Sequence, residues 1–235
     1  MPIIKGLQKT TLVDYPGKIA ATIFTAGCNF RCVFCHNPAL VEDSQSAGLP
    51  VIDAAELLEY LRGRTKQLEG ICISGGEPTL HRDLPEFIRD IKKLGYAVKL
   101  DTNGTNPAML RTLLAGQLLD YVAMDIKGPL ELYPQIVNSA VDTAKIRASI
   151  ELIMQSGVQY EFRTTVLPAF LDEANFAKVA GLINGASCYY LQQFHAGAHL
   201  LDPAYQQAGA YSAGQLNIFA RQLEPFVQKV AVRGT

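Results

Sequence analysis

The sequence lacks the marks of several specialised protein classes. No apolar run among its 235 residues approaches the ~20 residues that a membrane-spanning helix needs. The start, MPIIKGLQKTTLVDYP, has neither the apolar core nor the cleavage site of a signal peptide. There is no internal repeat, charge block or low-complexity tract, and the net charge is -1. These absences give no reason to expect a membrane or a nucleic acid as a partner.

What the chain does contain is typical of a folded globular protein, with 49% hydrophobic and 18% charged residues. Its five cysteines are an odd number without a secretory context, which argues against a disulfide framework. We therefore expect a reducing, cytoplasmic location. Three of the five lie close together in the stretch GCNFRCVFCHNP, where Cys28, Cys32 and Cys35 have the spacing CxxxCxxC.

Short apolar runs alternate with amphipathic stretches along the chain. Runs rich in β-branched and aromatic residues predict strands at residues 19–25, 70–74, 96–102, 121–127, 160–168 and 188–194. Capping residues and helical periodicity predict helices at 53–64, 84–95, 106–116, 143–157, 172–185 and 212–226. This alternation indicates βαβ units with parallel strands.

About six such units are too few for a closed eight-fold barrel, which typically needs ~250 residues. We predict an α/β fold, an incomplete (βα)6 TIM-like barrel, with a doubly wound open sheet as the alternative. A single domain over 1–235 is expected, with an N-terminal arm or hairpin (1–17), a core (18–196) and a C-terminal extension (197–235). Either fold places ligands at the carboxyl ends of the strands.

The cysteine motif directly follows the first predicted barrel strand, so it lies where a barrel binds its ligands. Thiolates suit zinc, copper(I) or iron–sulfur clusters. A structural zinc site usually takes four ligands, but Cys72 and Cys188 lie in apolar strands and His36 adjoins Cys35 too closely. In a [4Fe–4S] cluster, three cysteines leave one iron open to a small molecule. This cluster is the favoured interpretation, and zinc is the alternative.

CxxxCxxC at this place resembles the signature of the radical S-adenosylmethionine enzymes. The resemblance implies one [4Fe–4S] cluster on Cys28, Cys32 and Cys35, whose open iron binds S-adenosylmethionine. Reductive cleavage of that cofactor to a 5′-deoxyadenosyl radical is the activity implied. Phe34 matches an aromatic position near the adenine.

The next strand end also resembles this family. SGGEP at 74–78 matches its glycine-rich motif. In the family, glycines at the positions of Gly75 and Gly76 bind the cofactor ammonium group, and a glutamate like Glu77 arranges the loop.

Two further motifs, LDTNG and MDIK, resemble those of the enzymes that activate glycyl radical enzymes. The resemblance implies that Lys127 pairs with the cofactor carboxylate and that Asp101 and Asp125 hold a monovalent cation. The other positions implied to lie near the cofactor are Thr102, Arg163 and His195. The segment LVDYPG at 12–17 also matches, so that the resemblance extends from about residue 6 to 195.

The group most similar in these motifs activates anaerobic ribonucleoside-triphosphate reductase. It implies a glycyl radical enzyme as the partner and a flavodoxin or ferredoxin-type electron donor. Residues 37–53 contain no cysteine, so only one cluster is expected. Three alternatives stay open: a pyruvate formate-lyase-type activase, a small-molecule enzyme such as a 7-carboxy-7-deazaguanine synthase, and a non-catalytic iron–sulfur or zinc redox sensor.

Overall fold

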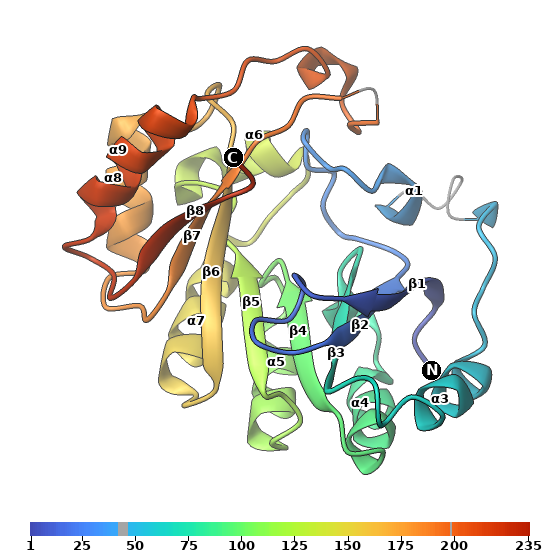
Figure 1. Ribbon diagram of the computed structural model, residues 1–235. Helices are drawn as coiled ribbons and strands as arrows, with labels where there is room; N and C mark the ends of the chain where they lie inside the picture. The colour runs from blue at the N-terminus through green and yellow to red at the C-terminus, as the bar shows by residue number, and fades with distance from the viewer. Residues whose placement is uncertain (42–46, 198) are drawn as a thin grey trace. The chain divides into compact units, whose positions relative to one another are not determined.

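The computed structural model describes residues 1–41, 47–197 and 199–235, and it shows an α/β fold (Figure 1). In this part of the chain the strands follow one another through the sheet in sequence order, from β1 to β8. The strands are β1 (Ile4–Thr11), β2 (Ala20–Thr25), β3 (Gly70–Gly75), β4 (Ala97–Thr102), β5 (Tyr121–Asp125), β6 (Gln159–Val166), β7 (Tyr189–Gln193) and β8 (Val230–Arg233). The helices are α1 (Pro38–Val41), α3 (Ala54–Arg62), α4 (Leu84–Lys93), α5 (Pro107–Ala115), α6 (Tyr133–Val137), α7 (Thr143–Gln155), α8 (Glu173–Leu182) and α9 (Ala213–Leu223).

The predicted elements are confirmed, each to within three residues at either end. Helix starts follow the capping residues, since the side chains of Asp53, Asn106, Asp172 and Ser212 each accept a hydrogen bond from a backbone amide of the first turn. None of the helices in the described ranges is long and apolar enough to cross a membrane. Part of the cysteine-free segment 37–53, residues 42–46, lies outside the described residues.

The described residues group into two compact units, and the prediction of a single domain is not tested by this grouping. The first unit comprises Met1–Asn29, Asn37–Thr102 and Asn106–Val122. The second comprises Phe30–His36, Asn103–Thr105 and Ala123–Thr235.

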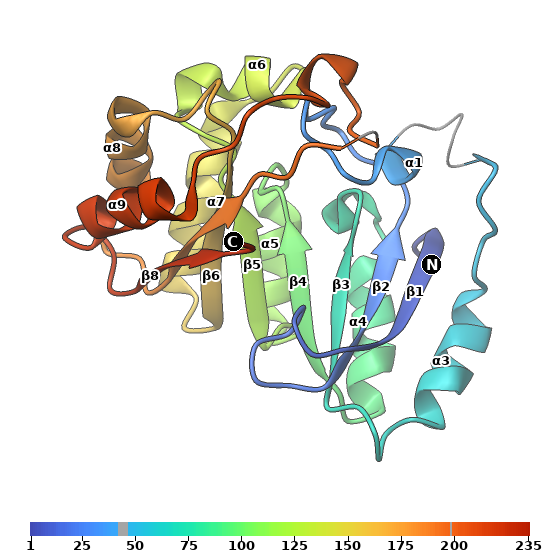
Figure 2. The same ribbon diagram turned by 45° about the horizontal axis from the view of Figure 1, so that its top comes forward.

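In the first unit, β2, β3 and β4 are parallel, and β1 pairs antiparallel with β2. The predicted N-terminal hairpin is therefore formed with the first parallel strand itself. Helices α3 and α4 lie side by side in both views (Figures 1 and 2). Tyr15, after β1, is buried against Gly70, where a β-carbon would lie 2.9 Å from the tyrosine ring. Only glycine fits there without moving that ring.

In the second unit, β6, β7 and β8 are parallel. Helices α8 and α9 lie side by side (Figures 1 and 2). Phe176 and Phe219 pack together with their ring centroids 4.9 Å apart. Strand β8 lies in the segment 197–235, for which the sequence predicted only an extension. Its four residues, VAVR, show no clear alternation of apolar and polar side chains that would have predicted a strand. All four are half-buried in the structure.

Candidate cofactor site

The cysteine loop and the glycine turn are joined through their backbones in the first unit. The Gly76 amide donates to the carbonyl of Thr25 (2.9 Å), and the Glu77 amide donates to that of Gly27 (2.8 Å). A β-carbon on Gly76 would overlap the Gly27 carbonyl, and one on Gly75, whose φ is +117°, would overlap the backbone of Thr25. The two glycines are therefore required by close backbone approach.

Glu77 is fully buried behind this turn. Its Oε1 accepts hydrogen bonds from the Thr79 amide (3.1 Å), from the Thr79 hydroxyl and from the Thr102 hydroxyl (2.8 Å). It also caps the short 3-10 helix Pro78–Leu80. Glu77 therefore shapes the turn, and its predicted role at the cofactor site stays a prediction. The Thr102 hydroxyl, predicted to lie near the cofactor, orders this glutamate.

Asp101 lies at the carboxyl end of β4 in the same unit. Its Oδ1 accepts from the ammonium of Lys99, and its Oδ2 accepts from the Ser74 hydroxyl (3.2 Å). Ser74 directly precedes the glycine turn. Asp101 thus links the ends of β3 and β4, and its charge is balanced by a lysine.

Asp125, Lys127 and Arg163 form an ion-pair cluster in the second unit. Lys127 Nζ lies 3.0 Å from Asp125 Oδ2, and Arg163 Nε lies 2.8 Å from Asp125 Oδ1. Burial by itself would raise the pKa of Asp125, but the two cations hold it well below its usual range. Burial opposes the charge of Lys127 as well, yet the carboxylate raises the pKa of the lysine above its usual value. All three side chains are therefore charged at neutral pH.

The second part of the cysteine loop is held within this unit by neighbours on two sides. The Val33 amide donates to the carbonyl of Ile136 in α6 (3.1 Å), and the Leu201 amide donates to the carbonyl of Cys35 (3.2 Å). The C-terminal extension therefore contributes to the support of the loop, a role that the sequence did not indicate.

Lys127 faces this part of the loop. Its Nζ lies 5.8 Å from the centre of the Phe34 ring. Burial raises the pKa of the Cys32 thiol to about 11, although the charge of Lys127 acts in the opposite direction. The predicted residues Phe34, Lys127 and Cys32 are thus brought together.

The three motif cysteines are free thiols, and the Cys35 amide donates to the Cys32 carbonyl (2.9 Å) in a tight turn. Soft thiolate donors of this kind and number fit an iron–sulfur cluster. Among residues 1–41, 47–197 and 199–235, no three His, Cys, Asp or Glu side chains gather closely enough to hold a metal ion. Cys28 belongs to the first unit and the other two to the second, and their assignment as cluster ligands stays a prediction.

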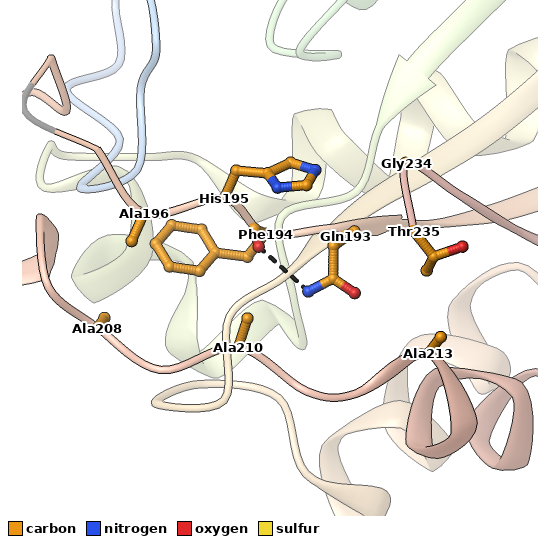
Figure 3. A pocket seen from close by; sticks show the side chains of 9 residues that line it. All are labelled: Gln193, Phe194, His195, Ala196, Ala208, Ala210, Ala213, Gly234 and Thr235. Atoms are coloured by element: carbon orange, nitrogen blue, oxygen red, sulfur yellow. Dashed lines mark hydrogen bonds between the residues drawn. The ribbon is translucent and has the colours of Figure 1, made fainter.

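His195 is exposed at the edge of a pocket of about 420 Å³ in the second unit (Figure 3). Burial first, and then the neighbouring His195, lower the pKa of His36. His195 therefore lies near the residue that follows Cys35. The pocket is lined by Gln193, Phe194, His195, Ala196, Ala208, Ala210, Ala213, Gly234 and Thr235. Its walls come partly from the C-terminal extension, in which the sequence marked no functional residue.

Comparison with known proteins identifies the family. The profile described as the Radical SAM superfamily matches residues 22–180, which include the cysteine loop, the glycine turn and the ion-pair cluster. This chain belongs to the radical SAM superfamily. Membership implies a [4Fe–4S] cluster and S-adenosylmethionine, as predicted.

Two curated relatives are similar over much of their length. MJ1227 of Methanocaldococcus jannaschii, provisionally named a glycyl-radical enzyme activating enzyme, is 30% identical over 236 residues, which cover 98% of this chain and 95% of the relative. The pyruvate formate-lyase-activating enzyme of Clostridium pasteurianum is 35% identical over 193 residues, which cover 77% of this chain and 75% of the relative.

The fold resembles that of SuiB from Streptococcus suis, with a TM-score of 0.66 at 12% sequence identity. The alignment covers 89% of this radical SAM chain and 47% of SuiB, so the chain spans about half the length of that protein. The likeness shows the fold, and the predicted α/β class with an incomplete (βα) barrel is confirmed.

Proposed function

We propose that this protein is an activating enzyme that generates a glycyl radical on a partner enzyme. The observation that carries the proposal is the similarity to MJ1227, which extends over 98% of this chain and 95% of that protein. The C. pasteurianum activating enzyme supports the same reading at 35% identity. The small-molecule and sensor alternatives have no comparable support along the whole chain.

The residues at the strand ends fit the cofactors of such an enzyme. Cys28, Cys32 and Cys35 would hold the cluster through three thiolates, which leaves one iron for S-adenosylmethionine. When bound, this pair supplies a 5′-deoxyadenosyl radical, which takes a hydrogen atom from a glycine Cα of the partner. A flavodoxin or ferredoxin-type protein would supply the electron. The odd number of free thiols supports a reducing, cytoplasmic setting.

The side chains near these motifs would bind and orient S-adenosylmethionine. The Lys127 ammonium, fixed by Asp125 and facing Phe34, would pair with the cofactor carboxylate. The backbone carbonyls of Gly75 and Gly76 would accept from the cofactor ammonium group, and Glu77 keeps their turn in place. Arg163 fixes Asp125, and His195 would lie near the cofactor.

The monovalent cation that the resemblance implies is not carried into this proposal. Asp101 accepts from the Lys99 ammonium, and Asp125 from those of Lys127 and Arg163. Each carboxylate is therefore already balanced by a cationic side chain.

We assign the partner as anaerobic ribonucleoside-triphosphate reductase, from the motifs discussed above. Because one relative activates pyruvate formate-lyase, that enzyme is the competing partner. The reconstituted, reduced protein would be incubated anaerobically with S-adenosylmethionine and each candidate partner, and the glycyl doublet recorded by electron paramagnetic resonance. We expect the doublet with the reductase, and none when its radical glycine is replaced by alanine. A doublet with the lyase alone would reject the partner, and formation of 5′-deoxyadenosine without any protein radical would reject the activase function.

A further inference from the structure

Lys99 is a lysine buried in the middle of β4, with a side chain that is only 1% exposed. Lysine is almost never fully buried unless its charge is paired. Its ammonium forms an ion pair with Asp101, two residues further along the same face of the strand. Cys72 Sγ lies 3.7 Å from Nζ, and the centre of the Tyr121 ring lies 6.0 Å from it. A carboxylate, a polarisable sulfur and an aromatic face therefore surround the ammonium of this buried lysine.

Both oxygens of Asp101 are engaged. Oδ1 accepts from Lys99 and Oδ2 from the hydroxyl of Ser74, next to the glycine turn. Lys99 therefore fixes the carboxylate that links β4 to this turn. A metal cation that used Asp101 Oδ1 would have to displace the ammonium, or add a second positive charge beside it in a buried place.

We infer that Lys99 is a built-in counter-ion, whose ammonium occupies the place at Asp101 that a monovalent metal cation would otherwise fill. Lys99 thereby acts as a positioning residue, through Asp101 and Ser74, on the turn that receives S-adenosylmethionine. Because the ammonium is tethered to the chain, it is present at every salt composition. This inference rests on the proposed function only in naming S-adenosylmethionine as the ligand. Its consequence is that the protein binds this ligand without any added metal cation.

Replacing Lys99 should create a dependence that the protein itself lacks. Lys99→Met keeps the length and apolar stem of the side chain but removes the charge. Asp101 then loses the ammonium that balances its charge, and a half-buried carboxylate without this balancing charge favours the uptake of a small cation. Sodium and potassium ions are small enough to approach it, whereas choline is not.

The first test is calorimetry of S-adenosylmethionine binding to the cluster-loaded protein in sodium, potassium and choline chloride at equal ionic strength. We expect the parent protein and Lys99→Arg to show the same affinity in all three salts. Lys99→Met should bind about tenfold more weakly in choline chloride and recover in one of the metal salts. Lys92→Met is the matched control, since Lys92 pairs with Asp120 in the same unit but at the surface, and it should be indifferent to the salt.

Two results would overturn the inference. One is a parent protein whose affinity for S-adenosylmethionine falls tenfold in choline chloride, because this would show that a metal cation contributes to binding although Lys99 is present. The other is a Lys99→Met variant with the same affinity in every salt.

The second test needs neither cluster nor cofactor. Thermal unfolding of the cluster-free protein is followed in the same three salts. We expect one midpoint for the parent, and for Lys99→Met a midpoint at least about 3 °C lower in choline than in sodium or potassium chloride. This measurement tests whether Lys99 balances the charge of Asp101, and it does not depend on S-adenosylmethionine binding. If S-adenosylmethionine does not bind, the proposed function fails but this inference is still tested.

If Lys99→Met does not fold in any salt, the double variant Lys99→Met with Asp101→Asn decides. Removing both charges of a buried pair costs far less than removing one. Recovery of the fold would support the charge-balancing role, and a double variant that stays unfolded would overturn it.

Discussion

The amide of Glu77 donates to the carbonyl of Gly27 (2.8 Å), so the glycine turn after β3 and the start of the cysteine loop after β2 form one backbone arrangement. Motifs almost fifty residues apart in the sequence are thereby placed together by two parallel neighbouring strands. In the proposed activating enzyme this arrangement would join the segment predicted to bind the cluster to the segment predicted to receive the cofactor.

A methyl group at Gly76 should break this arrangement. In Gly76→Ala the new β-carbon would overlap the Gly27 carbonyl, so the cysteine loop has to shift. We expect a loss of about 1–3 kcal/mol in unfolding free energy, as for other overpacked sites, and a strongly reduced iron content after reconstitution. Gly181→Ala is the matched control, because nothing lies within 4 Å of a β-carbon at this position in α8. It should be neutral or slightly stabilising, and an equal loss in both variants would contradict the argument.

Lys127 should contribute to cofactor binding rather than to stability alone. We expect Lys127→Ala to bind S-adenosylmethionine about 10–100-fold more weakly in calorimetry, because a charge-assisted contact to the cofactor carboxylate is lost. Lys178→Ala removes a surface lysine whose partner, Glu131, is equally exposed, and should leave the affinity unchanged. Unchanged affinity in Lys127→Ala would remove the lysine from the cofactor site.

The sequence predicted the fold well because strands such as β3 and β5 are short apolar runs between helices with clear caps. It also placed the motifs of Phe34, Cys32 and Lys127 at the same end of the sheet, since each follows the carboxyl end of a parallel strand. It did not predict the role of Lys99, because a lysine in a strand is ordinarily read as solvent-exposed, and only packing shows that it is buried. Nor did it indicate that Leu201 supports the cysteine loop, because a single backbone hydrogen bond leaves no pattern in the side chains.

Cys32 should be essential for the cluster and dispensable for the fold. We expect Cys32→Ala to lose iron and to form no 5′-deoxyadenosine after reduction with dithionite, while its circular dichroism spectrum stays that of the parent. Cys188→Ala removes a cysteine outside the motif and should keep both iron and activity. Production of 5′-deoxyadenosine by Cys32→Ala would show that this cysteine is not a cluster ligand.

The cluster-free protein should lose stability in alkali, in part through the same thiol. Burial raises the pKa of Cys32 from 9.0 to about 11, so the folded state favours the neutral thiol more than the unfolded state does. Its contribution is fully present below pH 9 and is lost as the pH rises toward 11, by at most about 2–3 kcal/mol at 1.36 kcal/mol per pKa unit. Buried tyrosines such as Tyr133, whose pKa burial also raises, add to the loss, so the comparison with Cys32→Ala isolates the thiol. In urea unfolding at pH 8 and pH 10.5, the difference in stability between parent and variant should shift in favour of the variant at the higher pH. A difference that does not change with pH would show that Cys32 titrates alike in the folded and unfolded states.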